Sequence, residues 1–179
     1  MDLKNLLFRC LIVATLIVGQ ATATHPAVVG NLEQSTEVDE VHSEVRKVIR
    51  VVDGDTIVVS PNEKVRLIGV DTPETVHPKK IVECFGKDAK EFTRRAVEGK
   101  TIRLVLDDVN RIRQHKDRYG RTLAYAYLED GRMLNRELIS QGYAHAYTRF
   151  RFRYRVEFRQ LERTARDQAV GLWSSCRIQ

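Results

Sequence analysis

The stretch at residues 65–75 constrains the fold more than any other, because it must form a strand and then stop. Its first half is rich in Val, Leu and Ile, which is typical of a largely buried strand. Pro73 has no N–H to donate to a sheet and biases Thr72 toward an extended conformation, so the chain turns where Asp71 and Glu74 appear. A strand end that carries carboxylates is a good platform for a metal ion.

Arg66 precedes this turn and is five residues from Asp71. An odd offset places two residues on opposite faces of a regular strand. If both serve one site, the strand must be interrupted between them, and Gly69 is the natural place for a bulge. We therefore predict a kink near Gly69, and a straight strand there would contradict a shared site.

Two β-branched runs precede this stretch, at residues 45–52 and 56–60. They are separated by Asp53-Gly54-Asp55, and a second turn signal at Pro61-Asn62 leads into residues 65–75. Three consecutive antiparallel strands follow from this pattern.

The rest of the chain alternates between helical and strand-like patterns. Helical spacing at residues 85–96 ends near Gly99, whereas residues 101–107 and 123–128 are strand-like and flank a charged connection at 109–121. Two further helices are expected, a short one around Leu134 and Leu138 that stops at Gln141-Gly142, and a longer one from Phe158 to Leu172, closed by Gly171 and Trp173. The order predicts an α+β fold, a five-stranded OB-fold β-barrel with about three helices, whose face commonly binds nucleic acids. No repeat of 20 to 50 residues is visible, which argues against a solenoid.

The N-terminal residues differ in composition from the rest of the chain. Lys4 and Arg9 precede an apolar run at residues 10–19, and Ala21-Thr22-Ala23 matches a small-x-small cleavage pattern. Residues 1–23 are therefore expected to be a secretory signal peptide. The alternative is an uncleaved anchor, but spanning a bilayer takes about 20 apolar residues and this run has about half that number.

Residues 24–44 are expected to form a flexible acidic leader, because they lack Lys, Arg and any sustained apolar period. The whole chain has 30 basic and 24 acidic residues, of which residues 1–44 contain two and six. The expected folded domain, residues 45–179, therefore has 28 basic and 18 acidic residues, a formal charge of +10. This balance favours an anionic partner, although a basic surface can simply be solvated.

Export also affects the interpretation of the cysteines. Cys10 would be lost with the signal peptide, which leaves Cys84 and Cys176 in an oxidising compartment, where one disulfide can form. Two unpaired thiols are the alternative. The expected location is secreted or periplasmic, without stable membrane association after removal of the signal peptide, and we expect a monomer.

Arginine alternates with aromatic residues at residues 148–159. One interpretation is an extended ribbon that binds single-stranded nucleic acid, since bases stack on rings and guanidinium groups bind phosphates. The other is the start of the last helix, with Phe158 in the core and the arginines in solvent.

Several short motifs together resemble the staphylococcal nuclease (thermonuclease) family over residues 45–173. They are Asp-Gly-Asp-Thr at 53–56, Arg-Leu-x-x-Val-Asp-Thr-Pro-Glu-Thr at 66–75, His-Pro-Lys-Lys at 77–80, Asp-x-Tyr-Gly-Arg at 117–121 and Leu-x-x-Gln-Gly at 138–142. Each motif alone is a common turn or helix signal, but they occur here in family order and spacing.

The resemblance implies a calcium site and a catalytic set. It implies that Asp55, Asp71 and the carbonyl of Thr72 bind Ca²⁺, that Glu74 positions and deprotonates the attacking water, and that Arg66 and Arg121 bind the phosphate. It also implies phosphate contacts for Arg118, which replaces a lysine, for Tyr119 and for Tyr147. Asp53 is expected either to support the metal from outside its ligand shell or to cap its turn.

A calcium-dependent endonuclease follows from the resemblance, acting on DNA and RNA with low sequence specificity and cleaving the P–O5′ bond to leave 3′-phosphate ends. Single-stranded or unwound regions are the expected substrates. The alternative is a noncatalytic OB-fold module that binds nucleic acid, but retention of the two aspartates, the glutamate and both arginines argues against it. A structural calcium-binding protein would leave the arginines without a role.

Overall fold

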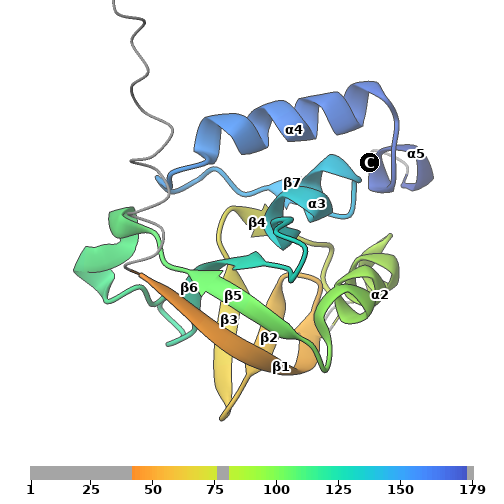
Figure 1. Ribbon diagram of the computed structural model, residues 1–179. Coiled ribbons are helices and arrows are strands. Elements are labelled where there is room, and N and C mark those ends of the chain that lie inside the picture. Colours follow the sequence, from red (N-terminus) through yellow and green to blue (C-terminus); the bar gives the residue numbers. More distant parts are fainter. Residues whose placement is uncertain (1–41, 76–80, 177–179) are drawn as a thin grey trace, which may run out of the picture. The chain divides into compact units, whose positions relative to one another are not determined.

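The computed structural model describes residues 42–75 and 81–176, and it contains a closed five-stranded barrel with strand order β1-β2-β3-β6-β5 (Figure 1). The barrel strands are β1 Ser43–Asp53, β2 Thr56–Val59, β3 Glu63–Leu67, β5 Thr101–Val105 and β6 Thr122–Tyr127. All neighbouring pairs are antiparallel except β3 and β6, which are parallel. This confirms the predicted OB-fold-like α+β class, with three consecutive antiparallel strands at its start.

Helices and a small second sheet complete the fold. They are β4 Val70–Asp71, α2 Gly86–Val97, the 3₁₀-helix η1 Asp108–Arg113, α3 Leu134–Ser140, β7 His145–Ala146, α4 Arg155–Asp167 and α5 Leu172–Ser175. As predicted, a helix (α2) lies between the third and fourth barrel strands. β4 and β7 pair with each other, and α3 lies beside α4 at one side of the barrel (Figure 1). Among the described residues, no helix has both the length and the apolar character needed to cross a membrane.

The core fills the barrel and continues under α3 and α4. All four residues of β2 are buried, as expected for a strand enclosed on both faces. Phe158 from α4 is fully buried and joins the same cluster as Val65 and Leu67 from β3. This core therefore holds α4 against β3. The chain continues from β3 into the turn at residues 71–75, which we call the acidic turn.

The predicted kink at Gly69 is confirmed, although it is a turn rather than a bulge. β3 ends at Leu67, Gly69 has φ +72°, and the chain resumes as β4. A Cβ at position 69 would lie 2.6 Å from Cζ of Phe152, so both the left-handed backbone and the packing require glycine.

The structure modifies three of the predicted segments. β1 begins at Ser43, because Ser43 and Glu44 pair with β5, so these two residues are not part of the leader. The charged connection predicted at residues 109–121 includes most of η1. For residues 148–159 each of the two interpretations describes one part. Residues 148–154 form neither helix nor strand, and α4 begins at Arg155. The predicted signal peptide, most of the leader and the His-Pro-Lys-Lys motif lie outside the described residues.

The last predicted helix is in fact two helices. α4 ends at Asp167, and Ala169 takes φ +49° before α5 begins at Leu172. The break lets Gly171 pack on Gly142, whose carbonyl oxygen would be 2.3 Å from a Cβ at position 171. The N–H of Leu172 donates to that carbonyl at 2.8 Å, so a contact distant in sequence overrides the helical periodicity.

Cys84 and Cys176 are joined by a disulfide, with 5.9 Å between their Cα atoms and a sequence separation of 92. We expect the double variant Cys84→Ser, Cys176→Ser to lose about 4 kcal/mol of unfolding free energy, because a cross-link of this length restricts the unfolded chain. Urea denaturation without reductant measures the loss. Dithiothreitol should destabilise the wild type and leave the variant unchanged. Equal stability of wild type and variant in the absence of reductant would contradict the prediction.

Candidate functional site

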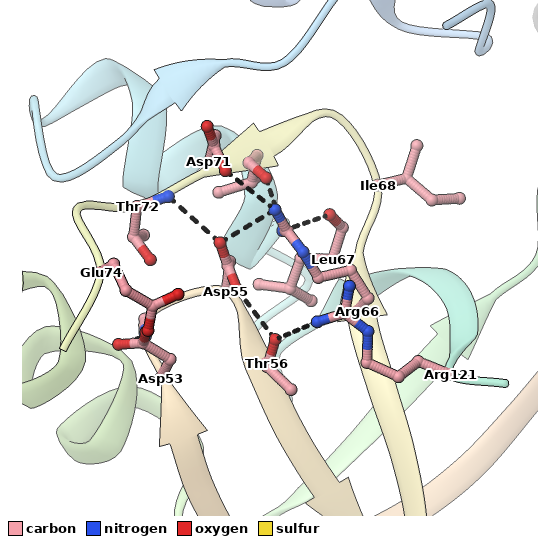
Figure 2. A network of polar contacts seen from close by, with 12 residues as sticks. Asp53, Asp55, Thr56, Arg66, Leu67, Ile68, Asp71, Thr72, Glu74 and Arg121 are labelled. Atoms are coloured by element: carbon pink, nitrogen blue, oxygen red, sulfur yellow. Dashed lines mark hydrogen bonds and ion pairs between the residues drawn. The ribbon is translucent and has the colours of Figure 1, made fainter. Parts of the chain in front are cut away.

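The turn between β1 and β2 places Asp55 at the centre of a polar network (Figure 2). Asp55 is buried, and its Oδ1 accepts a hydrogen bond from Oγ1 of Thr56 at 2.9 Å. Its Oδ2 accepts one from the backbone N–H of Thr72 at 3.2 Å. This second bond ties the β1–β2 turn to the acidic turn after β4.

Arg66 lies between the two aspartates that the sequence analysis selected. It stands opposite Thr56 in the β2–β3 pair, and its side chain is 14% exposed. Its Nη2 lies 3.0 Å from Oδ2 of Asp55 and 3.1 Å from Oδ1 of Asp71, and its Nη1 donates to the carbonyl of Val70 at 2.5 Å. The turn at Gly69 thus brings Asp71 back onto the arginine that precedes it.

Asp71 stands half exposed in β4, opposite His145 of β7. Partial burial raises the pKa of the Asp71 carboxyl, and the nearby charge of Asp55 adds to the rise, whereas Arg66 and His145 oppose it. At the Asp71 carboxyl the effect of burial on the pKa therefore outweighs the attraction of Arg66. His145 could not be assigned to this site from the sequence, because only the β4–β7 pairing reveals its position.

Arg121 reaches the same network from the segment before β6. The parallel pairing of β3 with β6 sets Leu123 opposite Arg66, and Nη1 of Arg121 donates to Oγ1 of Thr56 at 3.3 Å. A continuous chain of polar contacts therefore links Arg121 through Thr56 and Asp55 to Arg66 (Figure 2).

Asp117 fixes the position of Arg121, which the sequence analysis did not foresee. Its Oδ2 accepts from Nε of Arg121 at 2.7 Å, and its Oδ1 accepts from the backbone N–H groups of Tyr119 and Arg121, both at 2.9 Å. Burial acts to raise the pKa of Asp117, but these hydrogen bonds and the charge of Arg121 outweigh it and hold the pKa below its ordinary value. The Asp-x-Tyr-Gly-Arg spacing is typical of an Asx-turn and could have indicated this role of Asp117.

We expect this anchor to weaken in acid. Because the folded-state pKa of Asp117 is lowered, its contribution to stability is present above the ordinary value of about 3.9 and is lost as pH falls through the lowered pKa. Asp117→Asn should therefore have a lower free energy of unfolding than the wild type at pH 7, and the gap should narrow below about pH 4. Urea denaturation at several pH values measures the difference in free energy of unfolding between the two proteins. A difference that stays constant down to pH 3 would contradict the anchoring role of Asp117.

Asp53 and Glu74 form a separate carboxyl pair beside the network (Figure 2). Burial and then a hydrogen bond with Glu74 raise the pKa of Asp53, against the hydrogen bonds that it accepts. Those come from Oγ1 of Thr75 at 2.7 Å, from the N–H of Thr75 at 3.2 Å and from the N–H of Gly54 at 2.9 Å. Asp53 thus caps its own turn and also holds the end of the acidic turn.

A cavity of about 810 Å³ opens beside Arg66, Asp71 and Arg121. The three residues predicted to contact phosphate, Arg118, Tyr119 and Tyr147, all line it. The guanidinium of Arg118 lies 4.7 Å from the ring centroid of Tyr119. Glu74 is not among the described residues that line the cavity, although its expected role beside the phosphate requires Arg66 and Glu74 to face one pocket.

The oxygens around Arg66 are of the kind that a hard divalent cation prefers. Thr72 supports this fit, because its buried Oγ1 has no hydrogen-bond partner among the described residues. Within residues 42–75 and 81–176, no cluster of three or more His, Cys, Asp or Glu side chains is arranged for an ion. A cation held by Asp55 and Asp71 would therefore take its other ligands from backbone oxygens and water.

Comparison with known proteins identifies the family. The profile of the family described as "Staphylococcal nuclease homologue" matches residues 64–175, more than half of the chain. The chain belongs to the staphylococcal nuclease family.

Related proteins cover similar parts of the sequence. A thermonuclease of Staphylococcus hyicus is 40% identical over 146 residues, covering 79% of this chain and 83% of the relative. A thermonuclease of Staphylococcus intermedius is 41% identical, covering 75% of this chain and 79% of the relative. The endonuclease YncB of Bacillus subtilis is 35% identical, covering 70% of this chain and 59% of the relative.

Proposed function

We propose that this chain, a nuclease of the staphylococcal nuclease family, is a calcium-dependent endonuclease that hydrolyses DNA and RNA with low sequence specificity. In this proposal it cleaves the P–O5′ bond and leaves 3′-phosphate ends. One observation carries the proposal: Arg66 bridges Asp55 and Asp71, and a short chain of contacts links it to Arg121. Two acids and two arginines from separate segments thereby form one network, and Arg66, Asp71 and Arg121 of this network line the cavity.

The arginines suit a phosphodiester, which is an anion that gains further charge on its nonbridging oxygens during attack. Planar guanidinium groups bind two such oxygens at once, and Arg66 and Arg121 both line the cavity. Asp117 keeps Arg121 oriented, so less freedom is lost when the phosphate binds. These two side chains bind and orient the scissile phosphate.

Asp55, Asp71 and the carbonyl of Thr72 would hold the calcium ion, which supplies Lewis-acid polarisation of the phosphate when bound. Glu74 accepts a proton from the attacking water in this proposal. Asp53, through its hydrogen bond with Glu74 and its two bonds to Thr75, positions the segment that carries this base.

We propose that the protein is secreted or periplasmic and that residues 1–23 are removed. The apolar run followed by Ala21-Thr22-Ala23 supports export, and the disulfide between Cys84 and Cys176 suits an oxidising compartment. We propose that the exported protein acts as a monomer, without stable membrane association, on single-stranded or unwound DNA and RNA.

Analysis of product ends tests activity, metal dependence and bond choice together. Purified protein lacking residues 1–23 is incubated with denatured DNA or with RNA, in calcium or in chelator, and the ends are identified by mass spectrometry. The proposal expects cleavage with 3′-phosphate ends in calcium and none in chelator. Cleavage in chelator would refute the metal assignment, 5′-phosphate ends would refute the bond assignment, and no cleavage in calcium would refute the enzyme assignment.

A further inference from the structure

The cavity extends beyond Arg66 and Arg121 between two segments that the proposed mechanism does not use. One is η1, which contributes Ile112 and Arg113, and the other is the segment at residues 149–151, Arg149-Phe150-Arg151. Ile112 is 96% exposed and Phe150 is 53% exposed, which is unusual for large apolar side chains. We call the two segments, residues 112–113 and residues 149–151, the outer walls of the cavity.

A single buried carboxylate holds both outer walls. Oδ1 of Asp107 accepts from the N–H of Val109 at 3.0 Å and so caps η1, while its Oδ2 accepts from the N–H of Arg153 at 2.8 Å. Asp107 is only 1% exposed, and the hydroxyl of Tyr125 donates to the same Oδ2 at 2.5 Å. The two walls are therefore held relative to each other by the core of the barrel.

The segment that carries Phe150 is also fixed at its other end. The N–H of Tyr147 donates to the carbonyl of Gly69 at 2.9 Å, and Phe152 packs directly on Gly69. The buried ring of Phe152 thus holds the exposed ring of Phe150 at the cavity. This outer wall is therefore anchored to the turn that leads into Asp71.

The outer walls have the chemistry of a nucleic-acid surface. Arg113, Arg149 and Arg151 are exposed and form no ion pair with any described residue. The ring of Phe150 lies 5.9 Å from that of Tyr147, centroid to centroid, and is tilted by 57°. Exposed rings stack on bases and free guanidinium groups bind phosphates, and together they suit a single strand whose bases are unpaired.

We propose that Arg113, Arg149, Phe150 and Arg151 form an outer subsite for single-stranded nucleic acid, beyond the phosphate held by Arg66 and Arg121. The substrate class rests on the proposed function. A base stacks on Phe150, and the three arginines bind the phosphates of the following nucleotides. The subsite makes affinity rise with the length of the strand, and it disfavours a duplex because paired bases cannot reach the ring.

Length-dependent binding tests this subsite separately from cleavage. Labelled oligothymidylates of two to eight nucleotides are titrated against the full chain in chelator, and fluorescence anisotropy gives the Kd. The triple variant Arg149→Ala, Phe150→Ala, Arg151→Ala should bind the octanucleotide at least about 10-fold more weakly than wild type, with the dinucleotide within about 2-fold. Its plot of log affinity against log salt for the octanucleotide should be shallower by about 1.4, from two lost phosphate contacts.

A matched control removes the same kinds of side chain elsewhere. Val156→Ala, Arg163→Ala and Arg95→Ala together delete two exposed arginines and one exposed apolar residue from helices α4 and α2. This control should keep the wild-type length dependence. If the control and the triple variant lose affinity equally, or if neither does, the subsite is refuted, and thermal unfolding of both confirms that they are folded.

Two further results separate the possible explanations. Polyglutamate that competes with the octanucleotide at equal charge concentration would refute the assignment to nucleic acid. Hydrolysis of the dinucleotide in calcium reports on the proposed function alone. A wild type that binds with the expected length dependence but does not cleave would refute the nuclease and support the outer subsite. A wild type that cleaves but binds without length dependence would support the nuclease and refute the outer subsite.

Discussion

Replacement of Glu74 by Gln is expected to lower kcat by about 10²- to 10⁴-fold, the usual contribution of a general base. The amide has nearly the same shape as the carboxyl but cannot take a proton from water. It can still hydrogen-bond with Asp53, so the turn at residues 71–75 should keep its position. The Kd for an oligonucleotide in chelator and the melting temperature should therefore remain close to the wild-type values, while single-turnover cleavage in calcium measures the loss.

Glu129→Gln is the control for this variant, because Glu129 is exposed and lies in the connection between β6 and α3, away from the cavity at Arg66. It should cleave at the wild-type rate. If Glu74→Gln retained more than about a tenth of wild-type turnover, Glu74 would not be the base. The nearby carboxylates of Asp55 and Asp71 would then have to be tested in the same way.

Arg66→Lys should lower kcat by about 10²- to 10³-fold, as expected when a donor to the developing charge is lost. Lysine keeps the charge but not the planar fork that contacts Asp55, Asp71 and the carbonyl of Val70 at once. It cannot make the paired contacts with two phosphate oxygens. Single-turnover rates with saturating calcium measure the effect, and the pH dependence of the residual rate shows whether the base still acts normally.

Arg46→Lys is the matched control, since Arg46 is also an arginine in a barrel strand that contacts a carboxylate and a backbone carbonyl. It lies in β1 and pairs with Glu44, outside the cavity. This variant should cleave within about 2-fold of the wild type, whereas equal losses in both variants would indicate a general loss of stability. An active Arg66→Lys would remove Arg66 from phosphate binding.

Local sequence patterns predicted much of the fold, whereas the residues of the candidate site came mainly from the resemblance to a known family. Runs of β-branched and other apolar residues between turn signals predicted the first three strands, and the need to bring Arg66 and Asp71 together predicted the turn at Gly69. These predictions succeeded because each depends on residues within one or two turns of the chain. The expected phosphate contacts of Arg118 and Tyr119 came from the same resemblance, through the short motif Asp-x-Tyr-Gly-Arg.

Contacts between segments that are distant in sequence could not be predicted from local patterns. The break after α4 depends on Gly171 packing against Gly142, and periodicity alone continued that helix to Leu172. The role of Asp107 depends on Arg153, which is 46 residues away. The hydrogen bond between Asp53 and Glu74 likewise appears only when two turns meet, and it places the proposed base beside a second carboxyl group.

The parallel pairing of β3 with β6 has a consequence for how this protein acquires its chemistry. Arg66 and Leu123 face each other across 57 residues of chain, and Arg121 is positioned by the strand that makes this pair. Loop closure on this scale is costly until the intervening helix and strand are in place. The two arginines therefore line one cavity only when the barrel has closed, so recovery of cleavage during refolding would report closure of the barrel itself.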